Sequence, residues 1–151
     1  MATSTHALSD LPGLVGQTLG VSEWLLIDQA RIDAFAHATG DLQWIHVDPV
    51  RAAAGPFGST VAHGFLTLSL LPLMGDQALN ITGTRMAVNY GLNKVRFPAP
   101  VPVNSRLRGH FKLIACEAVG TAQQLSFEVS MEREGSDRPV CVAESVSRRY
   151  P

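Results

Sequence analysis

The sequence has few cysteines and almost no net charge, and each of these shortages excludes a class of protein. Only two cysteines, Cys116 and Cys141, occur among 151 residues, and they form no CxxC motif, which excludes a zinc ribbon and a disulfide framework. Both lie in strand-like segments, which is typical of reduced, buried thiols. The formal net charge is −1, and we therefore expect that the protein does not bind nucleic acid.

Long hydrophobic runs and targeting segments are also missing. The longest apolar run is Gly64–Gly75, which is well short of the ~20 residues of a membrane span and is followed by Asp76. The first ten residues contain neither the basic start nor the apolar run of a secretory signal. We therefore expect a cytoplasmic protein with no membrane partner.

The composition is that of a chain with a substantial core. Hydrophobic residues make up 46% of the sequence and charged residues only 17%, which is unlike a disordered or fibrous protein. The length suits one domain over residues 1–151. Helix signals dominate its N-terminal part and strand signals dominate its C-terminal part, so the composition and patterning predict an α+β domain.

Capping residues mark two helices in the N-terminal part. Asp28 is a good N-cap for a helix that reaches about Ala38, and Gly40 suits the left-handed position that follows its end. Asp48, followed by a proline, predicts a second, short helix over Val50–Ala54.

The apolar run predicts a third helix from about Gly64 to Leu79, interrupted near Pro72. This helix has no polar face, so we expect it to be buried on all sides. Strands to pack against it are expected mainly from Arg85 onward, in four segments: Met86–Phe97, Arg106–Ala118, Ala122–Glu134 and Val140–Tyr150.

The densest group of reactive side chains lies between the first two helices. Asp41 follows the first helix and His46 precedes the second, so both belong to a connecting segment held by rigid neighbours. The same residues also have a plain structural interpretation, in which Asp41 satisfies turn amides and His46 is a partly buried neighbour of the Asp48 cap. The residue types alone leave both interpretations open.

A second candidate group begins the third helix. The N–H groups at a helix start can stabilise a developing oxyanion, and Gly64 would let a ligand approach the backbone closely, although ordinary helix initiation explains the same residues. A metal site made of Asp41, His46, His63 and Asp48 matches no zinc signature. The sequence also lacks a GxSxG elbow and the glycine-rich nucleotide motifs, so none of these chemistries is indicated.

Two segments carry a family resemblance. The first is Phe35–Leu70, reading FAHATGDLQWIHVDPVRAAAGPFGSTVAHGFLTLSL, and the second is Val88–Val103, reading VNYGLNKVRFPAPVPV. Both resemble the MaoC-like (R)-specific enoyl-CoA hydratase family, in its NodN-like and mycobacterial 3-hydroxyacyl-thioester dehydratase branch. The hydratase motif of that family is matched by Gly40, Asp41, Ile45, His46 and the small residue Ala52.

The resemblance implies a hot-dog fold, in which an antiparallel sheet wraps around a long central hydrophobic helix, in a homodimer. It implies hydration of trans-2-enoyl-CoA, or the reverse dehydration, with Asp41 and His46 activating one water and the Gly64 N–H binding the thioester oxygen. The substrate would be an acyl-CoA or acyl-carrier-protein thioester. No metal or organic cofactor is expected.

The same resemblance suggests further substrate contacts at His63, Gln43 and Trp44. The last two stand where many relatives have Asn-Pro, and Pro72 stands where several hydratases have a serine. Lys94 and Arg96 lie two apart on one predicted strand face, which suits binding of the coenzyme A phosphates.

Two other functions compete with hydration. A hot-dog acyl-CoA thioesterase would use the same helix start but direct water to C1, and the hydratase spacing of Asp41 and His46 argues against it. A non-catalytic acyl-thioester binding protein is the other alternative, and the departure at Gln43 and Trp44 is its main support.

Overall fold

The computed structural model describes residues 2–151. Its main element is an antiparallel six-stranded sheet in the order β2-β6-β7-β8-β5, with β3 also paired to β6. The strands are β2 (Thr18–Val21), β3 (Leu25–Ile27), β5 (Met86–Arg96), β6 (Ser105–Val119), β7 (Ala122–Arg133) and β8 (Cys141–Tyr150). The four long strands confirm the prediction from the sequence.

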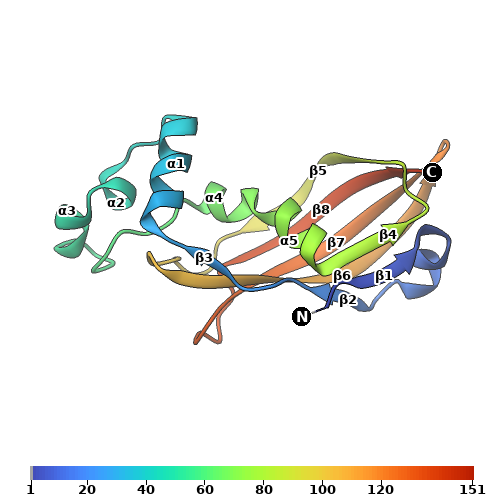
Figure 1. Cartoon of the computed structure of the whole chain (residues 1–151), viewed down its shortest axis with the longest axis horizontal. Coiled ribbons are helices and arrows are strands. Elements are labelled where there is room, and N and C mark those ends of the chain that lie inside the picture. Colours follow the sequence, from blue (N-terminus) through green and yellow to red (C-terminus); the bar gives the residue numbers. More distant parts are fainter. Residues whose placement is uncertain (1) are drawn as a thin grey trace.

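Two short helices, α4 (Gly64–Ser69) and α5 (Leu71–Ala78), lie against this sheet (Figure 1). Their buried side chains recur every four residues and meet apolar side chains of β6 and β7 in one core. The helical members of this core are Leu66, Leu70, Met74 and Ala78, and the strand members include Leu107, Phe111, Leu113, Phe127, Val129 and Met131.

The central helix differs from the prediction in two ways. It is two short helices that meet at Leu70 and end at Ala78, because Pro72 cannot continue a hydrogen-bond ladder but fits the first turn of α5. The prediction that it is buried on all sides is wrong for the single chain. Phe65 is 71% exposed and Leu73 is 41% exposed, since only one face of each helix meets the sheet.

Helices α1 (Gln29–Thr39), α2 (Trp44–Val47) and α3 (Pro49–Ala53) gather at one end of the molecule (Figure 1). The predicted caps are confirmed. The Asp28 carboxylate accepts from the backbone N–H of Arg31 at 2.9 Å, and Gly40 adopts a left-handed φ of 82°. Asp48 caps α3 in the same way.

The N-terminal part also contains elements that the sequence signals did not indicate. Strand β1 (Ser4–Ala7) pairs in parallel with β4 (Leu79–Thr82), and a 3-10 helix, η1 (Leu8–Leu14), follows β1. These elements are short, so neither a strand nor a helix period is visible in them.

The two thiols are free. Burial raises the pKa of Cys141 to about 11 and also raises the pKa of Cys116, so both thiols are mostly protonated at neutral pH. No helix within residues 2–151 is long and apolar enough to cross a membrane.

Candidate active site

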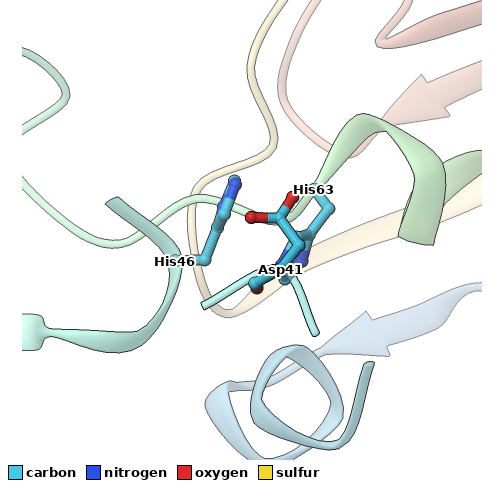
Figure 2. A group of neighbouring side chains, drawn as sticks. All are labelled: Asp41, His46 and His63. Carbon is cyan, nitrogen blue, oxygen red and sulfur yellow. The ribbon is translucent and has the colours of Figure 1, made fainter. Parts of the chain in front are cut away.

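Asp41, His46 and His63 form one cluster, although they belong to three different segments (Figure 2). One oxygen or ring nitrogen of each lies within 4.8 Å of the corresponding atoms of the others. Asp41 follows α1, His46 lies in α2, and His63 directly precedes α4. The structure thus brings the two candidate groups of the sequence into a single site.

His46 is held in one tautomer. The ring is 7% exposed, and its Nδ1 lies 2.6 Å from the carbonyl oxygen of Val61. Because a carbonyl can only accept, Nδ1 must carry the proton, and Nε2 of the neutral ring keeps its lone pair. Burial lowers the pKa of His46 and the neighbouring His63 lowers it further, while Val61 and Asp41 oppose this shift. The neutral ring with a basic Nε2 is therefore favoured.

His63 supports both other members of the cluster. Its ring is 2% exposed and stacks on the His46 ring, with centroids 3.8 Å apart and planes at 24°. Its Nε2 donates to the backbone carbonyl of Asp41 at 3.0 Å. Its Nδ1 is buried and finds no hydrogen-bond partner within residues 2–151. His63 therefore connects the segment around Asp41 to the start of α4 through this hydrogen bond.

Asp41 is the exposed member of the site. Its carboxylate accepts from the backbone N–H of Gln43 at 3.4 Å, which is a weak turn contact. Figure 2 shows the carboxylate directed toward the His46 ring. This contact agrees with the interpretation that Asp41 satisfies a turn amide. It also leaves the carboxylate able to accept a further hydrogen bond within the cluster.

Gln29 positions this site, and sequence reasoning missed it. Its side-chain nitrogen donates to the carbonyl of His46 at 2.8 Å, and its side-chain oxygen accepts from Thr60 at 2.5 Å. It thus connects α1 to α2 and to the segment before α4. Its place just after the Asp28 cap was the only signal in the sequence, and that signal indicates a helix start, not a positioning residue.

Gly64 is the first residue of α4, so its N–H lies outside the hydrogen-bond ladder of that helix. A Cβ at this position would lie 3.0 Å from the ring of Phe97. A side chain at this position would therefore require the Phe97 ring to move, and the N–H of Gly64 is next to His63 in the chain.

The other predicted contacts lie outside the cluster. Gln43 is the residue before α2, and the Trp44 ring is covered by the Arg51 guanidinium at 4.3 Å and packs closely against Gly55. Lys94 and Arg96 are exposed on β5.

The cluster contains donor types that bind divalent cations, namely two imidazoles and a carboxylate. Imidazole lone pairs lie in the plane of their ring, so the near-parallel, stacked rings of His46 and His63 are poorly placed to direct lone pairs at one point. This arrangement is unfavourable for a single tetrahedral ion.

A family model described as a MaoC like domain matches residues 10–134. The chain belongs to the MaoC-like family. It is 52% identical over 144 residues to 3-hydroxyacyl-thioester dehydratase Z of Mycobacterium tuberculosis, with 95% of both chains covered. It is 49% identical over 140 residues to Nodulation protein N of Rhizobium leguminosarum bv. viciae, with 91% of this chain and 87% of that protein covered.

The fold comparison agrees with this family membership. The (R)-hydratase from A. caviae involved in PHA biosynthesis superposes with a TM-score of 0.71 at 24% identity, covering 91% of this chain and 96% of that one. The predicted hot-dog fold is therefore confirmed, and it differs from the prediction in the division and the partial exposure of its central helix.

A groove of about 780 Å³ adjoins the site of this MaoC-like chain. Phe35 lines it, and the ring of Phe35 lies 4.9 Å from the His63 ring. From there the groove follows α4 and α5, between these helices and strands β5 and β8. Its helix side is mostly apolar and includes Phe65, Leu68 and Leu71. A space of this kind suits a chain-like ligand that ends at the cluster.

Proposed function

We propose that this MaoC-like protein catalyses the reversible hydration of a trans-2-enoyl thioester to an (R)-3-hydroxyacyl thioester, with Asp41 and His46 activating the water. The observation that carries the proposal is the fixed tautomer of His46, which leaves a lone pair on Nε2 in a ring that belongs to the same cluster as the Asp41 carboxylate. The 52% identity to a 3-hydroxyacyl-thioester dehydratase supports the same reaction.

The proposed reaction starts with one water molecule that donates hydrogen bonds to two side chains. The Asp41 carboxylate accepts from one of its O–H groups and the His46 Nε2 accepts from the other, which directs an oxygen lone pair of the water toward C3 of the enoyl group. The C3–O bond forms while one proton passes to this pair, and the electrons of the C2–C3 double bond move toward the thioester. The pair then returns a proton to C2.

The charge that develops during attack is placed on the thioester oxygen. The Gly64 N–H at the start of α4 is the proposed donor to this oxygen, because it is outside the helix ladder and adjacent to His63. The reverse sequence of steps removes water from the 3-hydroxyacyl thioester. In this proposal the chain's own residues move every proton, and no metal or organic cofactor takes part.

The rest of the substrate extends in two directions. We place the acyl chain in the groove that begins at Phe35. Lys94 and Arg96, exposed on β5, remain the proposed contacts for the phosphates of coenzyme A or of a carrier-protein arm. Changing both to alanine should weaken binding of the thioester, and unchanged affinity would contradict this assignment.

We also propose that the protein works as a symmetric homodimer. Strand β5 is a sheet edge, and exposed apolar side chains lie on it and on α4, among them Met86, Tyr90 and Phe65. Pairing with a second copy would cover such an edge and such a surface. Because Phe65 follows Gly64, the interface would lie near the site. Light scattering should give the mass of a dimer, and a monomer at micromolar concentration would contradict the proposal.

The catalytic proposal is tested with crotonyl-CoA as substrate. Loss of the conjugated double bond reports hydration, and release of free thiol reports thioesterase activity. Asp41→Asn and His46→Gln should each lower kcat by about 10²–10⁴-fold, with a smaller effect on KM. The double variant should lose much less than the product of the single losses, because the two groups act on one water.

A matched control is His37→Gln, which changes an exposed histidine of α1. Melting temperatures on the same preparations separate folding from catalysis. Near-normal turnover in a folded variant of Asp41 or His46 would remove that residue from the mechanism. Thiol release without hydration would instead indicate a thioesterase.

A further inference from the structure

The sheet side of the groove is polar at its far end. Ser145, Ser147 and Arg149 alternate along β8 and line the groove. Ser145 lies opposite the buried Phe127 of β7 and Ser147 opposite the buried Leu125, so this set of β8 side chains faces the core side of the sheet. If this side of the groove contacted only the hydrocarbon chain of a ligand, we would expect apolar residues at these three positions.

Arg149 is the charged member of these three residues. Its Nε is buried and has no hydrogen-bond partner within residues 2–151. Burial lowers the pKa of its guanidinium, while Asp76, which also lines the groove, opposes this shift. A buried guanidinium N–H without an acceptor is costly, and an alkyl chain in the groove would not supply one.

The polar end lies well away from the reacting carbons. The groove begins at Phe35 beside His63, and Asp76 and Arg149 line its far part. Asp76 of α5 is eleven positions after Phe65 of α4, which corresponds to a helical rise of about 16 Å. A group bound at Arg149 is therefore many bonds from the thioester.

We propose that the acyl chain of the substrate carries a hydroxyl group near its far end, held between Arg149 and Asp76. This inference rests on the proposed function. A hydroxyl oxygen accepts from the guanidinium and its hydrogen is donated to the carboxylate, so it matches both side chains. A terminal carboxylate would match Arg149 but would be repelled by Asp76, and a plain alkyl end would match neither.

The test uses trans-2-enoyl-CoA thioesters of increasing chain length, each with and without a terminal hydroxyl group. At the length that reaches Arg149, the hydroxylated substrate should have a kcat/KM about 10- to 100-fold higher than its plain counterpart, the size expected for a hydrogen bond to a charged group. Arg149→Met should abolish this preference.

Arg148→Met is the matched control. Its guanidinium lies 3.8 Å from the centroid of the Tyr90 ring, and its Nε donates to Gln124. Because neighbouring strand residues face opposite sides of the sheet, this variant should keep the preference of the unmodified protein. Asp76→Ala, at an exposed position of α5, is a second test variant and should reduce the preference even if Arg149→Met folds poorly.

Equal kcat/KM for plain and hydroxylated chains at every length, in a protein that hydrates crotonyl-CoA, would overturn this inference alone. That result is also expected if a second copy of the chain fills the far end of the groove. A preference that survives in both Arg149→Met and Asp76→Ala would overturn it as well. Failure to hydrate crotonyl-CoA would overturn the proposed function, and this inference with it.

Discussion

Replacing Gln29 with leucine should impair both stability and catalysis. The side chain donates to the carbonyl of His46 at 2.8 Å and to Asp33 at 2.8 Å, and it accepts from the hydroxyl of Thr60. Leucine has a similar size but can make none of these bonds. Thr60 is 2% exposed, so water cannot easily replace the lost partner.

The expected loss of stability follows from the groups left unpaired. The Thr60 hydroxyl and the His46 carbonyl each lose a partner, and an unsatisfied buried polar group costs ~1–3 kcal/mol. The free energy of unfolding should therefore fall by ~2–6 kcal/mol. Because the His46 backbone is no longer held by α1, its ring should also shift, and a displacement of ~1 Å can lower kcat by about 10²-fold.

The assay combines urea unfolding with hydration of crotonyl-CoA by the folded fraction. Gln17→Leu, at an exposed position, is the control and should change neither quantity. Thr60→Val removes the same bond from the other side, so its effect on stability should not add fully to that of Gln29→Leu. Full additivity, or normal kcat in the destabilised variant, would refute the positioning role of Gln29.

Two further predictions concern His63 and Gly20. His63→Phe keeps a ring against His46 but removes a neighbour that lowers its pKa, so the pKa of His46 should rise. Since the neutral ring is the proposed base, the acid limb of the pH–rate profile should move to higher pH; an unshifted limb, as expected for His37→Gln, would contradict this. Gly20→Ala should lower the free energy of unfolding by ~1–3 kcal/mol, because the new Cβ would meet the carbonyl oxygen of Ala78. Gly13→Ala, which meets nothing within 4 Å, is its control in the same urea titration, and equal stability of the two variants would count against that contact.

The pH dependence of folding gives an independent check on His46. Its pKa in the folded state is below the ordinary value of 6.5, so the unfolded chain binds this proton more readily. The contribution to stability is fully present above pH 6.5 and is lost as pH falls toward the lowered pKa. His46→Gln should show a weaker pH dependence of the unfolding free energy in that interval.

Much of the local structure could be predicted from the sequence. Asp28 and Gly40 mark the ends of α1, and the strand-like texture after Arg85 marks the long strands. These signals work because a cap or a turn residue satisfies backbone groups only a few residues away. The position of Asp41 directly after α1 follows from the same local rules. His46, which the sequence placed in the connecting segment, instead lies within α2, because this helix has too few residues to show a period.

The tertiary structure decided which faces and partners these elements have. An apolar run without a polar face predicted burial on all sides, but the chain supplies one sheet face and leaves Phe65 exposed. His63 stacks on His46, and Gln29 binds the His46 carbonyl, across separations of 17 residues in both cases. Such contacts depend on how α1, α2 and the start of α4 fold back on one another. The sequence by itself determined the elements and the residue types of the site. Packing between distant segments determined the tautomer of His46 and the exposure of Arg149 to the groove, because hydrogen-bond partners and burial exist only in the folded chain.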